Sequence, residues 1–351
     1  MPLATAPFST AILQWFDQHG RKHLPWQQNK TPYRVWISEI MLQQTQVSTV
    51  IPYFERFMQR FPDLPTLAAS NTDDVLHQWA GLGYYSRARN LHRAAQMVMQ
   101  TFDGHFPDNL EAMQTLPGIG RSTAGAILSI AFEQRATILD GNVKRVLARY
   151  LSITDPVNER SVEKSLWETA TTLTPPTRSA DYTQAIMDLG ATLCTRTKPQ
   201  CTSCPLVTTC KGHAEGIAEL LPRKKATREI PTHIATFLIL RAEQSILLEK
   251  RPPHGIWGGL WSLPEISGTP NKKLIHELCE QQLHLNIKSF TALKSFRHTF
   301  SHYHLEIHPV MVPTQLPAKI MADTDQIWYN PNQPAAIGLP KPVQLIMRNL
   351  P

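Results

Sequence analysis

LPGIGRSTAGAILSIAFEQRATILD, residues Leu116–Asp140, joins a Pro-Gly-x-Gly turn to a segment of small residues with helical spacing and to a carboxylate at its end. Glycines let a backbone approach a phosphate closely, and the amides that open a helix carry the positive end of its dipole. The pattern favours a site that grips a nucleic-acid backbone and presents Asp140 beside it. Because a short glycine motif is weakly specific, a helix-turn-helix corner whose glycines only relieve crowding is the alternative.

Composition agrees with this interpretation without requiring it. The 351 residues, of which 42% are hydrophobic, suffice for two or more domains, and the net charge of +7 favours a polyanionic partner. No apolar run reaches the length of a membrane span, and the first residues lack the basic and apolar regions of a signal peptide. We therefore expect a cytoplasmic monomer with no membrane partner.

Cysteine usage is more specific than composition. Four of the five cysteines lie within one short stretch, with gaps of six, two and five residues: Cys194, Cys201, Cys204 and Cys210. Disulfides are rare in a reducing cytoplasm, so this crowding predicts a shared set of metal ligands. Zinc ribbons usually pair two CxxC knuckles, whereas one CxxC flanked by more widely spaced cysteines favours an iron–sulfur cluster and leaves zinc open. Cys279 stands apart and is expected to be a buried apolar residue.

The first two thirds of the chain read as an all-α body. Apolar residues recur at three- and four-residue intervals from Pro7 to about Leu221. The periodic segments are Val35–Val50, Asp74–Trp79, Asn90–Met99, Ser122–Phe132 and Val143–Leu151. A charged segment bracketed by prolines, Leu221–Pro231, then predicts an exposed linker.

The remaining third predicts an α+β domain. The segments Thr232–Arg251 and Phe296–Val312 alternate or run apolar as strands do, and Lys272–Gln282 has helical spacing. Residues 298, 300, 302, 304, 306 and 308 would share one face of a single strand and include four histidines. A metal site there is disfavoured, because neither a cysteine nor HExxH spacing accompanies them.

Five motifs together resemble one family. They are LPW at 24–26, SEIMLQQTQV at 38–47, GLGYYSRARNL at 81–91, ILDGNVKRVLARY at 138–150 and FSH at 300–302. With the hairpin and the cysteines, they resemble the helix-hairpin-helix DNA glycosylases of the endonuclease III superfamily, and within it the MutY family of adenine DNA glycosylases. The resemblance covers nearly the whole chain and is weakest at 264–293.

This resemblance implies a fold, a cofactor and a partner. It implies a multidomain chain with an all-α glycosylase region at 1–221, made of a six-helix barrel at about 28–138 and a cluster domain from 1–27 and 139–221. A linker at 222–231 and an α+β, Nudix-like lesion-recognition domain at 232–351 would follow. The four clustered cysteines would hold one four-iron, four-sulfur (4Fe-4S) cluster. The partner would be double-stranded DNA in which adenine is mispaired with 8-oxoguanine or guanine.

Two carboxylates fit the chemistry of breaking the bond between adenine and its sugar. This reaction needs an acid that protonates the leaving base and a negative group that steadies an oxocarbenium-like sugar. Glu39 has apolar neighbours at three- and four-residue spacing, which should raise its pKa. Asp140 precedes a predicted helix, whose first amides and cations, Lys144 and Arg145, should favour the ionised form. Opposite pKa shifts would make Glu39 the acid and Asp140 the anion.

Neither carboxylate is specific on its own. A helical glutamate is more often solvated, and an aspartate before a helix is more often a simple N-cap. By the resemblance, Glu39 delivers a proton to the adenine and assists water. Asp140 then stabilises the cationic sugar or briefly bonds to it, and the sequence leaves both options open. Asn142 would orient groups near Asp140, although an asparagine there needs no function.

The hairpin discriminates within the superfamily. By the resemblance, bifunctional members carry a lysine there whose amine attacks the sugar, whereas this chain has Ser122. We therefore expect a monofunctional glycosylase that leaves an abasic site. Arg121 and the amides around Gly118 and Gly120 are expected to contact phosphate, which positions an enzyme without reading sequence.

Extruding a base from a duplex leaves a gap that the protein must fill. The resemblance places Gln44 and Tyr84 against the base opposite the target, and Leu42 near the extruded adenine. Core packing is the alternative for Tyr84 and, more strongly, for Leu42. Three arginines of the next helix are expected either to face phosphate or to be solvated: Arg87, Arg89 and Arg93.

The C-terminal domain carries a second specificity argument. By the resemblance, Phe300, Ser301 and His302 form a loop or strand end that recognises 8-oxoguanine, with the serine and histidine bonding its altered edge. Leu274 and Leu278 stand where a hydrolytic Nudix enzyme needs carboxylates for a divalent metal. This domain is therefore expected to read a lesion and not to hydrolyse nucleotides.

Two other functions remain open at this point. An endonuclease III-like enzyme that removes oxidised pyrimidines is disfavoured by Ser122 and by the added domain with its FSH motif. A non-catalytic module, whose cluster and hairpin scan duplexes, differs in kind. Changing Glu39 to Gln separates these readings, because only an enzyme that uses this acid loses base release while it keeps DNA binding.

Overall fold

The computed structural model describes residues 5–223, 229–316 and 325–350. Contacts divide the chain into two units, one formed by residues 1–69 and 90–227 and the other by residues 70–89 and 228–351. Residues 224–228 of the predicted linker lie outside the described part of the chain. The second unit therefore combines the C-terminal region with a short segment from the helical half.

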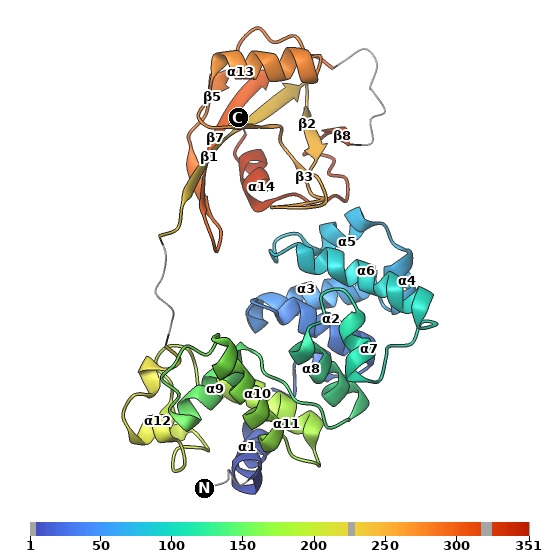
Figure 1. Cartoon of the computed structure of the whole chain (residues 1–351). Helices are drawn as coiled ribbons and strands as arrows, with labels where there is room; N and C mark the ends of the chain where they lie inside the picture. The colour runs from blue at the N-terminus through green and yellow to red at the C-terminus, as the bar shows by residue number, and fades with distance from the viewer. Residues whose placement is uncertain (1–4, 224–228, 317–324, 351) are drawn as a thin grey trace. The chain divides into compact units, whose positions relative to one another are not determined.

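The first unit is helical, as the apolar periodicity predicts (Figure 1). Its α-helices are α1 Thr5–His19, α2 Pro32–Leu42, α3 Val47–Arg60, α4 Leu64–Ala69, α7 Leu110–Thr115, α8 Arg121–Phe132, α9 Gly141–Leu151, α10 Arg160–Leu173, α11 Ser179–Thr192 and α12 Lys211–Ala214. Short 3-10 turns lie at η1 Pro25–Gln27, η2 Cys201–Ser203 and η3 Ala218–Leu220, and α6, Ser86–Thr101, starts in the second unit. Helix α11 packs against α1, α8 and α9, while α2 packs against α8.

Glycines permit the closest of these approaches. A Cβ atom on Gly190 of α11 would lie 2.7 Å from Cβ of Asn142 in α9. A Cβ atom on Gly125 of α8 would lie 2.2 Å from the main-chain oxygen of Thr137. Side chains do not approach so closely in packed interiors, so these two glycines hold the segment 137–142 tightly between α8 and α11.

One predicted helix is two helices. The periodicity predicts a helix over Val35–Val50, but α2 ends at Leu42 and α3 begins at Val47. At the break, Gln44 adopts a left-handed main-chain conformation with φ 58°. A non-glycine residue in this region interrupts an α-helix and costs free energy. The break exposes the Gln44 side chain beside the cavity described below.

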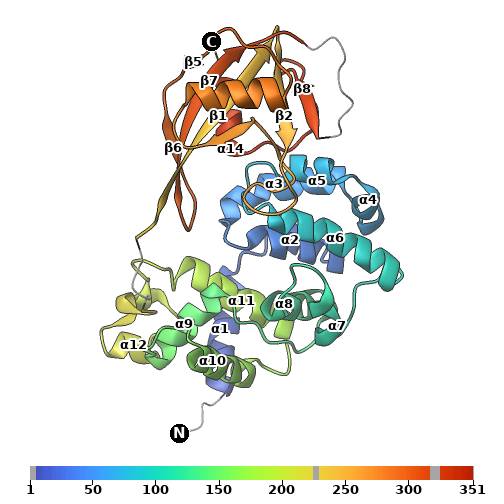
Figure 2. The ribbon, with the colours of Figure 1, turned by 45° about the horizontal axis from the view of Figure 1, so that its top comes forward.

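The second unit contains a mixed sheet, which has eight strands in the described residues (Figure 2). The strands are β1 Thr232–Ala242, β2 Ser245–Lys250, β3 Trp261–Ser262, β4 Glu265–Ser267, β5 Thr291–Ala292, β6 Phe296–Thr299, β7 His304–Pro313 and β8 Gln326–Tyr329. The main path runs β3-β2-β1-β7-β5, with β4 paired to β1, β6 to β7 and β8 to β2. Strands β1 and β7 pair in parallel, and the other pairs are antiparallel.

Both faces of this sheet are buried. Leu238 and Leu240 of β1 share a cluster with Ile275 and Cys279, which confirms that the isolated cysteine is a buried apolar residue. These two partners belong to α13, Lys272–Glu277, and to the π-helical turn Leu278–Gln282 that continues it, so the predicted helix is present. The intervening β1 residues Phe237 and Ile239 point to the other face and are also fully buried.

The segment 70–89 is tied to this sheet by polar contacts. It contains helix α5, Thr72–Trp79, and the start of α6. Asp73 Oδ2 accepts hydrogen bonds from Lys250 Nζ at 3.0 Å and from Trp261 Nε1 at 3.4 Å. The Arg89 guanidinium donates to the main-chain oxygen of Gly258. Helix α14, Lys341–Arg348, completes the unit.

The predicted long strand at Phe296–Val312 is a hairpin. Strands β6 and β7 pair antiparallel from Phe296↔Ile307 to Thr299↔His304, and residues 300–303 form the turn. The prediction of one continuous histidine-bearing face is therefore wrong, because the chain reverses between His302 and His304. Alternation alone does not reveal a turn whose residues are themselves aromatic and polar. The FSH motif lies at the strand end and turn, as the resemblance implied.

Candidate active site

A cavity of about 750 Å³ in the first unit brings together six of the predicted site residues. They are Glu39, Leu42, Gln44, Ser122, Asp140 and Asn142. Helix α2 and the loop after it, the start of α8 and the start of α9 supply them, so the helical packing joins distant parts of the sequence. Volumes in this range are typical of small-molecule sites.

The remaining predicted contact residues lie outside this cavity. Tyr84, Phe300, Ser301 and His302 line a second cavity, of about 330 Å³, in the second unit. Gly118, Gly120 and Arg121 form the hairpin that leads into α8. The predicted set therefore forms three groups: one in each cavity and one in the hairpin.

Glu39 lies on α2 and lines the first cavity. Thr31 caps this helix by accepting a hydrogen bond from the Arg34 main-chain nitrogen at 3.2 Å, and the neighbours Val35 and Trp36 are buried. Burial, together with the negative charge of Asp140, raises the pKa of Glu39 to about 8. The acid is therefore protonated in most molecules at neutral pH, in the direction expected from its apolar neighbours.

Asp140 caps the N-terminus of α9. Its Oδ1 accepts a hydrogen bond from the Val143 main-chain nitrogen at 2.8 Å, and its Oδ2 accepts one from Asn142 Nδ2 at 3.0 Å. Burial nevertheless raises the pKa of Asp140, although these bonds and the charge of Arg145 act to lower it. The expected net shift was therefore wrong, because desolvation outweighs the hydrogen bonds. Lys144 contributes nothing here, since it pairs with Glu163 at 2.7 Å.

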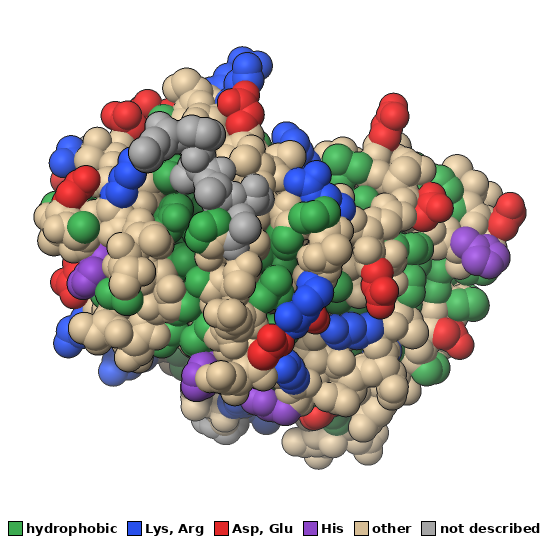
Figure 3. Space-filling view, turned by 90° about the horizontal axis from the view of Figure 1, so that it is seen from below, with side chains coloured by type: hydrophobic (Ala, Val, Ile, Leu, Met, Phe, Trp, Pro, Cys, Tyr) green, Lys and Arg blue, Asp and Glu red, His purple; other side chains and the backbone are tan. Residues whose placement is uncertain are grey.

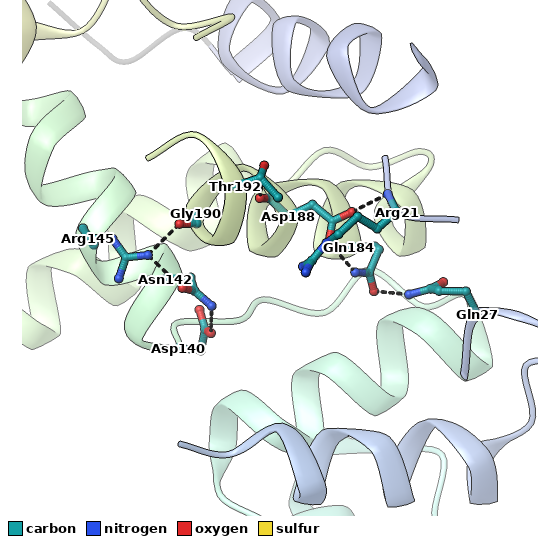
Figure 4. Close-up of polar contacts among 9 residues, drawn as sticks. All are labelled: Arg21, Gln27, Asp140, Asn142, Arg145, Gln184, Asp188, Gly190 and Thr192. Carbon is teal, nitrogen blue, oxygen red and sulfur yellow. Dashed lines mark hydrogen bonds and ion pairs between the residues drawn. The ribbon is translucent and has the colours of Figure 1, made fainter. Parts of the chain in front are cut away.

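A chain of hydrogen bonds runs from Asp140 through Asn142 to Arg145 (Figure 4), and Arg145 continues it to the main chain of Cys194. Asn142 donates to Asp140 and accepts from Arg145 Nη2 at 2.8 Å. Arg145 Nη2 also donates to the Gly190 main-chain oxygen at 2.7 Å, and its Nε donates to the Cys194 main-chain oxygen at 2.7 Å. Asn142 thus orients the carboxylate, and Arg145 orients Asn142.

The hairpin has the geometry of a phosphate-binding turn. Gly118 has a left-handed φ of 82°, and a Cβ there would lie 2.9 Å from Cβ of Asn90, so this position requires glycine. A Cβ on Gly120 would meet no atom within 4 Å, so its α-carbon faces open space. The Arg121 guanidinium stacks on Trp167, 4.0 Å from the ring centroid. These features leave the amides at the start of α8 accessible to an anion.

Ser122 has a structural partner. Its Oγ accepts a hydrogen bond from the Leu139 main-chain nitrogen at 3.0 Å. The hydroxyl therefore holds the segment before Asp140 against α8, while the side chain lines the cavity.

The two predicted gap-filling residues share an unusual main-chain conformation. Gln44 and Tyr84 have left-handed φ values of 58° and 50°. Strained conformations of this kind concentrate at functional sites. The Tyr84 side chain is 48% exposed, which excludes core packing for this residue, whereas Leu42 is half-buried in the cavity wall.

Arg87 and Arg89 do not behave as predicted. Arg87 is buried, and its guanidinium lies 5.3 Å from the ring of Trp79 and 5.6 Å from the ring of Tyr84. It supports Tyr84 and faces neither phosphate nor bulk solvent. Arg89 bonds the second unit's main chain, as described above, while Arg93 is exposed and donates to Asn90. Aromatic ring faces and main-chain carbonyl groups can bind helical arginines, and the spacing of residues in the sequence does not reveal such partners.

Aromatic rings surround the FSH turn. The Phe300 ring centroid lies 5.2 Å from that of Trp257, 4.7 Å from His298 and 4.6 Å from Tyr303. Burial and the charge of Lys341 lower the pKa of His298, which disfavours its charged form. The close packing of these rings fixes the conformation of the turn. The exposed Ser301 and His302 side chains project from it.

Two glutamates of the C-terminal domain, Glu265 and Glu280, lie beside basic side chains. Glu265 pairs with Arg251 at 2.7 Å, and Glu280 lies 3.4 Å from His276. Within the described ranges, no three histidine, cysteine or acidic side chains are placed to hold a single metal ion.

The four clustered cysteines line one small cavity with Arg149. All four are reduced cysteines outside any disulfide, and burial raises the pKa of Cys201, Cys204 and Cys210. Arg149 is buried and its Nη1 lies 3.3 Å from Cys194 Sγ. Four cysteine side chains in one cavity are a donor set that both zinc sites and iron–sulfur clusters use.

Charge is mixed on the surface in view in Figure 3. Lys and Arg side chains alternate there with Asp and Glu, so the described residues of this face form no broad field of one sign. Among the described residues, no helix is both long and apolar enough to cross a membrane.

Sequence reasoning missed part of the first cavity wall. Trp26, Gln184 and Met187 also line it. Trp26 was within reach, because it belongs to the LPW motif. Gln184 lies inside α11, and a single glutamine in a helix gives no sequence signal of function. In the structure it contacts the buried Asp188 at 2.9 Å (Figure 4).

Comparisons with known proteins agree with this geometry. Residues 37–171 match the family described as HhH-GPD superfamily base excision DNA repair protein, and residues 235–349 match the NUDIX domain. The adenine DNA glycosylase of Buchnera aphidicola from Acyrthosiphon pisum is 42% identical over 97% of this chain and 97% of its own length. The Homo sapiens adenine DNA glycosylase is 35% identical over 85% of this chain and 65% of its own length.

Solved structures resemble the helical part. A thermostable thymine-DNA glycosylase has a TM-score of 0.55 and 28% identity, covering 60% of this chain and 97% of its own. Endonuclease III in a non-covalent DNA complex has a TM-score of 0.50 and 22% identity, covering 60% of this chain and 94% of its own. This likeness supports the fold. Relatives this similar match the chain over nearly its full length, and the chain combines a helix-hairpin-helix core with a Nudix-like domain. The chain therefore belongs to the adenine DNA glycosylases, enzymes of base excision repair.

Proposed function

We propose that this enzyme is a monofunctional glycosylase that removes adenine opposite 8-oxoguanine or guanine in duplex DNA. The observation that carries the proposal is the pair of carboxyl groups in one cavity: Glu39, whose pKa burial raises, and Asp140, which two hydrogen-bond donors hold. An acid and an anion on the same cavity wall are what cleavage of a glycosidic bond requires.

The two carboxyl groups take different roles in this proposal. Glu39, protonated at neutral pH, donates its proton to the extruded adenine and so makes it a neutral leaving group. Asp140 stabilises the oxocarbenium-like sugar, because its two hydrogen bonds hold a carboxylate oxygen in place and favour the charge that the cation attracts. Water then completes the reaction with Glu39 as the base.

The absence of a nucleophilic amine supports monofunctional chemistry. Ser122 occupies the hairpin position, and its hydroxyl is engaged with the main chain of Leu139. The described residues that line the cavity include no lysine. An abasic site is therefore the expected product.

The second cavity supports a lesion-reading role. Tyr84 and the FSH turn share this cavity within one unit, so an aromatic ring and two polar side chains are available to one base. Ser301 and His302 offer hydroxyl and imidazole groups to the N7–H and O8 that distinguish 8-oxoguanine from guanine. Replacing both by Ala should reduce the preference for 8-oxoguanine more than it reduces chemistry.

The four cysteines would hold one 4Fe-4S cluster. Such a cluster supplies no step of the cleavage; it cross-links residues 194–210. Arg145 and Arg149 contact this loop from α9, and the loop's fixed position would keep Arg145, Asn142 and Asp140 in register.

A single-turnover assay tests the proposal. Duplexes carry adenine opposite 8-oxoguanine, guanine or thymine, and released adenine is identified by mass spectrometry. We expect release from the first two, an alkali-labile abasic product, and no release by Glu39→Gln with DNA affinity retained. Release of an oxidised pyrimidine instead, or an unchanged rate in Glu39→Gln, would contradict it.

A further inference from the structure

One face of α10 contacts two basic side chains of neighbouring helices. Glu163 and Trp167 lie four residues apart on α10, so they share a face of this helix. Glu163 Oε1 accepts a hydrogen bond from Lys144 Nζ of α9 at 2.7 Å. The Trp167 ring lies against the guanidinium of Arg121, the first residue of α8, at 4.0 Å from the ring centroid.

These two contacts have different electrostatic consequences. The carboxylate of Glu163 offsets the charge of Lys144, whereas an aromatic ring carries no net charge. The N–H donors of a guanidinium lie in its plane, so stacking on a ring leaves them directed outward. Across residues 5–223, 229–316 and 325–350, the Arg121 guanidinium pairs with no carboxylate. Lys144 therefore has its acceptor within the protein, and Arg121 keeps its charge and its donors for an external one.

The stacking also restricts the Arg121 side chain. Its distance of 4.0 Å is the shortest between a cation and a ring among the described residues, where the other such distances range from 4.6 to 5.7 Å. Trp167 is half-buried beside the fully buried Leu166, whereas Arg121 is exposed. An exposed arginine samples many rotamers, and ordering it on binding costs affinity. The ring has already ordered much of this side chain before a ligand arrives.

A phosphate of the DNA backbone fits this guanidinium. The planar fork of N–H donors matches two oxygens of one phosphate, and the positive net charge of the chain favours a polyanion. Arg121 directly follows Gly120, whose α-carbon faces open space, so the protein leaves room for a ligand on that side. Contacts of this kind position a protein on a duplex without reading its sequence.

We propose that Trp167 is a positioning residue whose ring holds the Arg121 guanidinium ordered and uncompensated, so that it binds one backbone phosphate of the duplex. This inference rests on the proposed function, because it requires DNA beside the cavity that Ser122 and Asp140 line. Trp167 acts through Arg121 and contacts no reacting atom.

The test measures binding to a duplex with an uncleavable abasic analogue over a range of salt concentrations. Arg121→Ala should weaken binding and reduce the slope of log K against log[salt] by about 0.9, the value for one phosphate contact. Trp167→Leu keeps the arginine but removes the ring, so binding should weaken roughly 2–10-fold. Trp167→Phe retains a ring face and should restore most of this loss.

A double-mutant cycle separates positioning from a structural defect. In an Arg121→Ala background, Trp167→Leu should weaken binding no further, because the group through which it acts is gone. A structural defect would persist in that background. Trp15→Leu is the matched control, since Trp15 is a half-buried helical tryptophan whose ring neighbours His19 at 6.1 Å, and it should bind DNA as the parent does.

Arg121→Lys covers poor folding of Trp167→Leu. It alters an exposed side chain and keeps the charge but loses the planar fork, so binding should weaken about as much as in Trp167→Leu. Parental affinity in folded Trp167→Leu or in Arg121→Lys, or an unchanged salt slope in Arg121→Ala, would overturn the inference. A parent that binds the abasic duplex but releases no adenine would instead defeat the proposed function.

Discussion

Glu39 and Asp140 carry the same functional group in different settings. Glu39 has apolar neighbours along its own helix, and this local pattern was enough to predict that its pKa is raised. Asp140 lies at the start of α9, which packs against α11, a helix distant in sequence, so counting nearby amides and cations gave the wrong net direction. Desolvation depends on everything packed around a group, and a sequence window contains only part of that.

The raised pKa of Glu39 predicts a stability cost. Between about pH 4.5 and 8 the folded protein holds a proton that the unfolded chain releases, so stability falls as pH rises through this window. Glu39→Gln removes the cost. Full conversion of the shift gives about 5 kcal/mol, which partial exposure reduces to about 1–3 kcal/mol at pH 8. Urea unfolding at pH 4 and pH 8 measures this, with the surface variant Glu111→Gln as control; equal stabilisation at both pH values would contradict the assignment.

The same pKa predicts a pH dependence of catalysis. Because Glu39 must be protonated to act as the acid, single-turnover base release should fall roughly tenfold per pH unit above about pH 8. Single-turnover rates on one duplex between pH 6 and 10, with DNA binding measured in parallel, check this. A rate that stays flat to pH 10 would mean that another group supplies the proton.

At the scale of elements, helix existence was predictable and helix ends were not. The body is helical where apolar residues recur, but this pattern alone missed the break at Gln44 and the turn at Phe300–Tyr303, of which only the resemblance suggested the second. Both interruptions are stabilised by contacts from other segments and contain no glycine or proline. They are also where predicted DNA-contacting side chains lie, which is the usual location of local strain.

Two substitutions of Asp140, at the start of α9, separate its role as a helix cap from its role in catalysis. Asp140→Asn keeps a side-chain oxygen for the Val143 amide, so its stability should stay within about 0.5 kcal/mol of the parent while base release is lost. Asp140→Ala loses the cap as well and should cost about 1 kcal/mol more. Thermal unfolding compares them, with Asn109→Ala at the N-cap of α7 as a cap-only control. Full activity in Asp140→Asn would exclude a role for the negative charge.

The hairpin offers a matched pair of glycines. Gly118→Ala forces a left-handed φ and a clash with Asn90, so it should destabilise by about 1–3 kcal/mol. Gly120→Ala meets open space and should change stability by less than about 0.5 kcal/mol, yet its methyl group would hold a phosphate away from the amides. Binding to a duplex with an uncleavable abasic analogue should therefore weaken several-fold. Unaffected binding in Gly120→Ala would remove the phosphate contact from this turn.

At the scale of the whole molecule, the order of domains followed from composition and spacing, whereas the membership of residues 70–89 did not. This segment reads as one more amphipathic helix pair. Its contacts with the C-terminal domain include the pair of Asp73 and Lys250, which lie 177 residues apart in the sequence. No local pattern reports a partner at that separation.

Lys250→Met tests this division into units. The substitution removes the cationic partner of Asp73 Oδ2. Because Asp73 Oδ1 already has no hydrogen-bond partner among the described residues, α5 should open more readily. A loss of about 1–2 kcal/mol corresponds to amide hydrogen exchange about 5–30 times faster in α5, with α8 and α9 unchanged. Lys273→Met, whose pair with Glu277 is exposed, is the control. Equal acceleration in α8 and α9 would show that the two units do not open separately.

The split second unit also has a consequence for biosynthesis. The 138 residues from Asn90 to Thr227 must leave the ribosome after Arg89 before the rest of that unit begins to emerge. At typical translation speeds this takes about 7–30 s, during which Leu76, which packs against Gly338 in the finished protein, has not met that neighbour. The nascent chain thus carries an unfinished apolar surface for most of its synthesis, a window in which a holding chaperone can bind.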